Sequence, residues 1–243
     1  MDANSPLPPF HLFDEDSDFR IIERRLPHWS QAGAVCFITW RTVDSMPKAV
    51  IAQWQHDREQ LLRRHGIDPF GPSWRKQLQA LGRPTAQSIL DGLWNRWQDS
   101  LDACHGACVL RRSELARTVA DSLQHFDGDR YVIFDFVVMP NHVHLLASFP
   151  DEDAMLAQCE SWKHFTAVQL NRHLKQRGRF WQQDAFDHLV RSEKQFWYLR
   201  DYIAANPQKA RLSGGESLHY SKALCRSNAD AAGDEFHLSS RGA

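Results

Sequence analysis

The sequence predicts an α+β domain in which a central antiparallel sheet carries helices on one side. Two observations favour this class. Apolar, β-branched runs at 34–42 and 130–138 are typical of strands, and a third such run follows at 142–149. Pro140 and Asn141 make a tight connection between the last two runs, which therefore form an antiparallel hairpin. The longer segments between the strands carry apolar residues at helical spacing.

The first half of the chain begins with residues 1–25, which are rich in Pro and Asp and are expected to be a disordered tail. The strand at 34–42 follows. Residues 47–111 are mostly helical and are interpreted as an insertion. Within it, helices are expected over 49–65 and 84–102, where apolar side chains recur every three or four positions.

The second half begins with a helix expected over 114–126, ended by the turn signal Asp-Gly-Asp before the strand at 130–138. A long amphipathic helix is expected over 153–176 and stops near Gly178. Residues 213–243 are rich in Ser, Gly, Ala and Asp, and we expect a flexible C-terminal tail.

Composition excludes several classes of protein. No apolar run approaches the roughly 20 residues that cross a bilayer, and the N-terminus carries no secretory signal. Five scattered cysteines favour reduced thiols and a cytoplasmic location. Cys104 and Cys108 flank a histidine, but no second ligand pair stands at zinc-like spacing, so we interpret them as small buried or loop residues.

Charge is unevenly distributed along the chain. The net charge of −1 does not favour a nucleic-acid-binding protein. Residues 161–212, however, hold ten basic and four acidic side chains, an excess of six positive charges. Any contact with phosphate groups is therefore expected in this half.

The motif MPNHVHLL, residues 139–146, covers the tight connection and the start of the strand predicted at 142–149, and it holds two histidines. Because side chains alternate between faces along a strand, His142 and His144 point the same way and Val143 points the opposite way. Their Cα atoms are then roughly 7 Å apart, which allows both imidazoles to bind one metal ion. The alternative is that each histidine covers a polar patch on a half-exposed sheet.

A second motif, YIAANP at 202–207, follows a helical run at 193–201. Residues four apart in a helix share a face, so Tyr202 presents its phenol beside the amide of Asn206. The alternative is a buried, hydrogen-bonded tyrosine and an asparagine that closes the helix ahead of Pro207.

These motifs belong to a set of blocks that stand in a fixed order. The set comprises residues 139–146, 161–167, 180–182 leading into 186–191, and 202–207, preceded by an opening segment at 26–29 and 34–40. In this order they resemble the HUH single-tyrosine transposases and, more closely, the REP-associated tyrosine transposases. The resemblance covers about residues 26–212.

The resemblance implies a ferredoxin-like HUH domain over 26–212, with the histidines on a central strand and the tyrosine on a helix nearby. It implies a divalent metal, Mg²⁺ or Mn²⁺, bound by His142, His144 and Asn206. Tyr202 would be the nucleophile, preferred over Tyr198 because it stands immediately before Ile-x-x-Asn-Pro. The insertion at 47–111 is longer than in compact relatives, and its role is open.

The implied activity is DNA cleavage and strand transfer through a 5′-phosphotyrosine intermediate, by a monomer or homodimer. The expected partner is single-stranded or hairpin DNA that resembles a repetitive extragenic palindrome. Candidate DNA contacts are Lys163, Arg179, Arg191 and Lys194, although a surface lysine without a specific role explains Lys163 equally well.

Two other functions remain open. One is a non-catalytic, DNA-binding regulator on the same scaffold. The other is an iron oxygenase with a two-histidine, one-carboxylate site. That site needs an acid near the histidine pair, and the sequence offers none at His-x-Asp or His-x-Glu spacing.

Overall fold

The computed structural model describes residues 20–23, 27–30, 33–183 and 186–224 of the chain. Its elements, in chain order, are β1 (Arg20–Glu23), β2 (Pro27–Ser30), β3 (Val35–Arg41), α1 (Lys48–Arg64), α2 (Trp74–Ala80), α3 (Arg83–Asp102), a short 3₁₀ helix (Val109–Arg111), α4 (Ser113–Gln124), β4 (Val132–Val138), β5 (His142–Ser148), α5 (Glu152–His173), β6 (Phe186–Leu189), α6 (Glu193–Lys209) and β7 (Leu218–Ser221).

The main sheet has five strands in the order β6-β3-β5-β4-β7, and every neighbouring pair is antiparallel. Helix α4 connects β3 to β4, and α5 connects β5 to β6, which gives the β-α-β-β-α-β chain order of the ferredoxin-like fold. The predicted ferredoxin-like α+β fold with a central antiparallel sheet is confirmed.

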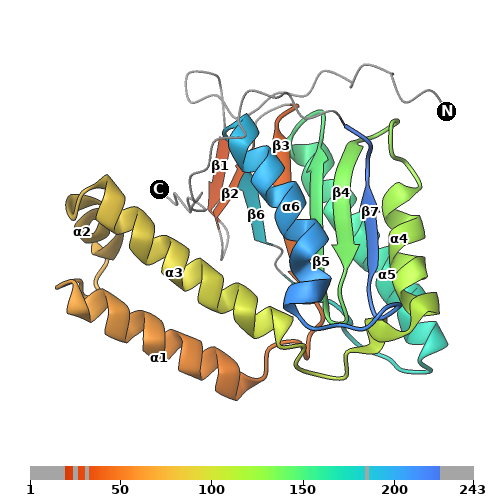
Figure 1. Ribbon diagram of the computed structural model, residues 1–243, viewed down its shortest axis with the longest axis horizontal. Coiled ribbons are helices and arrows are strands. Elements are labelled where there is room, and N and C mark those ends of the chain that lie inside the picture. Colours follow the sequence, from red (N-terminus) through yellow and green to blue (C-terminus); the bar gives the residue numbers. More distant parts are fainter. Residues whose placement is uncertain (1–19, 24–26, 31–32, 184–185, 225–243) are drawn as a thin grey trace.

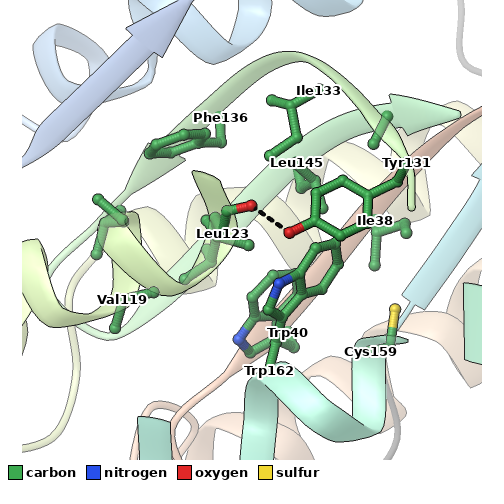
Figure 2. Close-up of a cluster of buried hydrophobic side chains, with 14 of the residues drawn as sticks. Ile38, Trp40, Val119, Leu123, Tyr131, Ile133, Phe136, Leu145, Cys159 and Trp162 are labelled. Atoms are coloured by element: carbon green, nitrogen blue, oxygen red, sulfur yellow. Dashed lines mark hydrogen bonds between the residues drawn. The ribbon is translucent and has the colours of Figure 1, made fainter. Parts of the chain in front are cut away.

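One face of the sheet is covered by α4 and α5, which pack beside each other (Figure 1). Apolar side chains of α4, such as Val119 and Leu123, meet Trp162 of α5 and the inward side chains of the strands (Figure 2). Tyr131 is buried in this cluster, and its hydroxyl donates to the carbonyl of Leu123 at 2.6 Å. This satisfies a polar group that would otherwise destabilise the core.

The opposite face is covered by α6, which lies across the sheet (Figure 1). Its apolar stripe of Phe196, Leu199 and Ile203 packs on Phe37 and Leu146. The expectation of helices on one side only is therefore wrong. The physical reason is that β3 and β4 carry apolar side chains on both faces, so both faces need a covering layer.

Helix α6 begins where Ser192 accepts a hydrogen bond from the backbone N–H of Gln195 at 3.1 Å. It continues through Pro207 and ends at Lys209. The alternative in which Asn206 closes the helix is therefore wrong, and Asn206 keeps its place one turn after Tyr202.

The flexible tail expected at 213–243 is corrected at its start. Leu218–Ser221 form β7, which pairs with β4 at the edge of the sheet. Tyr220 supplies the reason, because its ring stacks on Phe136 at 5.2 Å between centroids. The remainder of that tail, residues 225–243, lies outside the described residues.

The disordered tail expected at 1–25 is corrected at Arg20–Glu23, which form β1 and pair with β2. Residues 1–19 lie outside the described part of the chain. Phe186–Leu189 form β6, a strand that the apolar pattern did not predict.

The insertion contains both expected helices, as α1 and α3, together with the short α2. These three helices form an arm that extends away from the sheet (Figure 1). The arm has a small core of its own, which includes Leu62, Ile67, Leu78, Ile89 and Leu93. Within the described residues, no helix is both long and apolar enough to cross a membrane.

A buried ion pair fixes α6 to the sheet. The Arg200 guanidinium contacts the carboxylate of Asp135 on β4 at 2.5 Å. It also donates to the Ser221 hydroxyl at 2.8 Å and to the Lys222 carbonyl at 2.6 Å. One side chain thus joins α6, β4 and the end of β7.

We expect Arg200→Ala to lower the free energy of unfolding by about 3–5 kcal/mol, because Asp135 is left buried without its partner. Chemical denaturation of the variant measures this loss. The control is Arg117→Ala on the exposed surface of α4, where the change should stay within about 0.5 kcal/mol. Equal stability of the two variants would refute the anchoring role.

Candidate metal centre and tyrosine site

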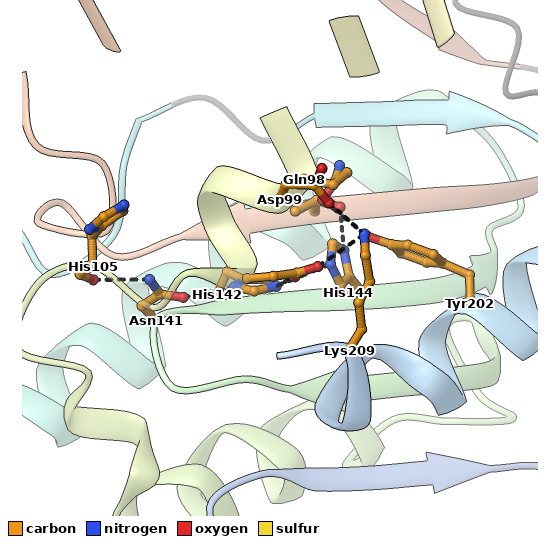
Figure 3. Close-up of polar contacts among 10 residues, drawn as sticks. Gln98, Asp99, His105, Asn141, His142, His144, Tyr202 and Lys209 are labelled. Atoms are coloured by element: carbon orange, nitrogen blue, oxygen red, sulfur yellow. Dashed lines mark hydrogen bonds and ion pairs between the residues drawn. The ribbon is translucent and has the colours of Figure 1, made fainter. Parts of the chain in front are cut away.

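His142 and His144 lie at the start of β5 and are both completely buried. Their Nε2 atoms face each other at 3.1 Å (Figure 3). Val143 belongs to the core on the opposite face. The prediction that the two imidazoles share one face of the strand is confirmed.

Each imidazole is oriented by a partner on its other nitrogen. Nδ1 of His142 donates to Oδ1 of Asn141 at 2.7 Å, and the amide nitrogen of Asn141 donates to the His105 carbonyl at 3.0 Å. Because a carbonyl oxygen only accepts, the proton of His142 lies on Nδ1, and its Nε2 lone pair faces Nε2 of His144. Nδ1 of His144 is hydrogen-bonded to the Thr39 hydroxyl at 2.7 Å. Such outer contacts position imidazoles for metal binding.

Asp102, the last residue of α3, adds a carboxylate to the pair. Its Oδ1 lies 3.9 Å from Nε2 of His142. One ligand atom from each of Asp102, His142 and His144 lies within 4.8 Å of the others. These three residues are therefore a candidate metal site, in which an acid from the insertion joins two histidines from the sheet.

Nothing in the linear spacing indicates Asp102, which precedes His142 by 40 positions. The sequence has no acid beside the histidine pair, which disfavours a two-histidine, one-carboxylate site. The structure reverses this expectation, because α3 brings an acid from a distant part of the chain.

Asn206, the third ligand expected from the sequence, is completely buried on α6. Burial raises the pKa of both Asp102 and Tyr202, and the Asn206 amide, which is close enough to interact with both groups, opposes each shift. Neither its oxygen nor its nitrogen makes a hydrogen bond of normal geometry. A buried, unsatisfied amide oxygen is a further ligand position that a cation at this site would satisfy.

The electrostatics of the site suit metal binding. Burial lowers the pKa of His142 to about 3, and burial also holds the pKa of His144 well below its usual value. Both imidazoles are therefore neutral at physiological pH, which is the form that binds metals. Burial raises the pKa of Asp102, while Lys209, at 3.3 Å, opposes this shift. Lys209 also pairs with Asp99 at 2.9 Å (Figure 3).

Tyr202 lies on α6 directly beside the histidines. Its ring centroid is 5.4 Å from that of His144, and its hydroxyl donates to Oε1 of Gln98 on α3 at 3.2 Å (Figure 3). Burial, followed by the charge of Asp102, raises the pKa of Tyr202 well above 10. The phenol is therefore neutral at physiological pH. Tyr198 is half-buried one turn earlier on the same helix.

The four candidate DNA contacts do not gather around Tyr202. Lys163 is on α5, beyond the opposite face of the sheet, and donates to the Gln183 carbonyl at 2.7 Å. Arg179 is exposed in the segment after α5. Arg191 and Lys194 flank the first turn of α6, while Tyr202 is in its second half. Their contact with DNA stays a prediction.

The donor set comprises two neutral imidazole nitrogens, one carboxylate and one amide oxygen. Mn²⁺ accepts imidazole more readily than Mg²⁺, which prefers an all-oxygen shell. The residues present therefore fit a divalent cation, with Mn²⁺ as the better match of the two expected metals.

Comparison with known proteins finds a similar solved structure. No protein family matches the chain, and no curated protein matches it. A solved structure described as a REP-associated tyrosine transposase bound to a REP hairpin is similar to it, with 16% identity and a TM-score of 0.39. The match covers 79% of this chain and 73% of that one.

Metal binding should depend on Asp102. We expect Asp102→Ala and His144→Ala to weaken binding of Mn²⁺ to the purified protein by 10-fold or more, since each change removes a ligand. Isothermal titration calorimetry measures the affinity. The matched control is Asp99→Ala, which removes a carboxylate on the same helix that pairs with the same lysine. An equal loss in the control would assign the effect to charge alone.

The metal-free protein should lose stability in acid because of its buried histidines. The pKa of His142 is about 3 in the folded chain and about 6.5 when unfolded, so the unfolded chain binds more protons between these values. The free energy of unfolding should therefore fall as the pH drops below about 6.5, by up to about 1.4 kcal/mol per pH unit for each histidine. Denaturation in EDTA between pH 7 and 4 measures the slope. His142→Gln should make the slope shallower, and an unchanged slope would contradict the assignment.

Proposed function

We propose that this protein is a metal-dependent endonuclease and strand transferase for single-stranded DNA, with Tyr202 as its nucleophile. The observation that carries this proposal is the position of the Tyr202 ring, 5.4 Å from the ring of His144 in the candidate metal site. A phenol beside a metal site is suited to attack on a phosphodiester.

The metal would be held by His142, His144 and Asp102, with the Asn206 oxygen as a further ligand. When bound, a divalent cation neutralises charge on the scissile phosphate and polarises its phosphorus. The chain itself orients the nucleophile. Gln98 accepts the hydrogen bond of the Tyr202 hydroxyl, and the anchored α6 holds the ring in place.

In the proposed reaction, Oη of Tyr202 loses its proton and bonds to phosphorus, while the bond to the 3′-oxygen breaks and that oxygen takes up a proton. The products are a free 3′-hydroxyl and a 5′-phosphotyrosine. Because phenolate is a better leaving group than an alkoxide, the 3′-hydroxyl of another strand can reverse the step. Cleavage and strand transfer then need no external energy. The raised pKa of Tyr202 means that the phenol stays protonated until positive charge is brought beside Oη.

The blocks that resemble the REP-associated tyrosine transposases support this proposal. Residues 139–146 and 202–207 are far apart in sequence, yet their histidine and tyrosine rings are in contact. The proposed partner is single-stranded or hairpin DNA of the palindromic kind, bound by a monomer or homodimer. The domain expected from the sequence covers residues 26–212. We propose that it extends to residue 221, because β7 belongs to its sheet.

A second candidate is an iron oxygenase, favoured by the Asp102, His142 and His144 triad. Oxygen consumption after loading with Fe²⁺ under anaerobic conditions tests it. That function gives Tyr202 no role as a nucleophile, so the two candidates differ in the product that they form on DNA.

Tyr202→Phe should eliminate the covalent protein–DNA adduct, because it removes the attacking oxygen and keeps the packed ring. Tyr198→Phe is the matched control on the same helix and should retain the adduct. A labelled hairpin oligonucleotide with Mn²⁺, resolved on a denaturing gel, shows the adduct as a shifted band. Cleavage by the parent without any adduct would indicate hydrolysis by water, and DNA binding without cleavage would indicate the non-catalytic regulator.

A further inference from the structure

The arm formed by α1, α2 and α3 has a strongly basic outer end. We call residues 58–83 the arm tip; it contains the end of α1, the whole of α2 and the first residue of α3. It holds six basic and two acidic side chains, although the whole chain has a net charge of −1. The exposed basic residues are Arg63, Arg64, Arg75, Lys76 and Arg83.

The two acidic side chains of the arm tip neutralise little of this charge. Oδ1 of Asp68 accepts a hydrogen bond from the backbone N–H of Phe70 at 3.1 Å, so this carboxylate holds the loop before α2. Burial lowers the pKa of Arg58, and the charge of the neighbouring Glu59 opposes that shift, so this acid interacts with a partly buried guanidinium. The exposed cations remain as a positive surface.

Aromatic rings are interleaved with these cations. Phe70 is 69% exposed, and the Arg63 guanidinium lies over its ring at 6.0 Å. The Trp74 ring has guanidinium groups of Arg58 and Arg75 at 4.8 and 5.2 Å. Trp74 is partly buried and packs against the small core of the arm, whereas Phe70 is not part of that core. Packing therefore does not explain why an apolar ring is held open at the surface.

An exposed ring and a partly buried one, each beside arginine, are a combination suited to binding single-stranded nucleic acid. The rings stack with unpaired bases, and the guanidinium groups contact phosphates. A duplex offers no free base faces. An acidic protein surface has no bases with which the exposed phenylalanine could stack. The chemistry therefore favours a single strand over other polyanions.

Helix α3 connects the arm tip to the candidate active site. Its 20 residues span about 30 Å. Its first residue, Arg83, belongs to the tip, whereas Gln98 and Asp102 near its end contact Tyr202 and join the histidine pair.

We propose that the arm tip is a second binding surface for the single-stranded DNA that extends from the strand cut at Tyr202. This inference rests on the proposed function. It adds a role for the insertion, which holds flanking DNA at a distance from the site and supplies Asp102 at its other end.

The test is DNA binding by the full-length protein, measured by fluorescence anisotropy with an oligothymidine of 30 nucleotides over a range of salt concentrations. Arg63→Ala/Arg75→Ala removes two exposed guanidinium groups that contact rings. The slope of log affinity against log salt should become shallower by about 1.4, since each phosphate contact on a single strand contributes about 0.7. Phe70→Ala should weaken binding roughly 10-fold at fixed salt.

The matched control is Arg117→Ala/Arg130→Ala on the α4 side, where the Arg130 guanidinium also lies over a ring, that of Phe126 at 3.6 Å. This control should bind DNA as the parent does. Arg63→Lys/Arg75→Lys should keep the salt slope of the parent, because the charge is retained.

Equal affinity of the parent and both arm-tip variants for the oligonucleotide would overturn this inference and leave the proposed function intact. A loss that appears only with duplex DNA would also overturn it. Failure of the parent to bind any single strand would contradict the proposed function and this inference together. Circular dichroism of each variant shows that the helices are retained.

Discussion

The pairing of β5 with β3 is the interaction on which the candidate site depends. Over seven consecutive residue pairs, it places Thr39 opposite His144 and Arg41 opposite His142. A shift of one residue would turn both histidines into the apolar core under α4 and α5. The register is fixed because β5 is buried on both faces, so that each side chain has only one acceptable environment. The hydrogen bond between Thr39 and His144 then follows from the pairing itself.

Two helices complete the site on the face of the sheet that α6 covers. Helix α6 brings Tyr202 and Asn206, and the pair between Arg200 and Asp135 fixes its position. Helix α3 brings Asp102 and Gln98 from the insertion. The insertion is therefore part of the candidate site, whereas its sequence suggested only an added helical segment. Because α3 runs from the arm tip to Asp102, this helix connects the basic surface of the arm tip with the candidate site.

Much of the sheet could be predicted from the sequence, because its signals are local. The alternation of His142, Val143 and His144 is enough to place both imidazoles on one face. The four-residue spacing of Tyr202 and Asn206 placed both on one side of a helix, and α6 continues past Pro207 as that requires. Asp102 could not be predicted, because its place depends on how a 20-residue helix docks. The strand at Leu218–Ser221 could not be predicted, because it is stabilised by distant parts of the chain, through pairing with β4 and the hydrogen bond from Arg200 to Ser221.

Lys209 has a consequence for how this site assembles. Its ammonium contacts the carboxylate of Asp102 at 3.3 Å, and Asp102 is buried beside two neutral imidazoles. The chain thus carries its own counter-ion for the acid that it buries. A divalent cation bound beside Asp102 would compete with Lys209 for this carboxylate. Because Lys209 also pairs with Asp99, its ammonium would keep a carboxylate partner.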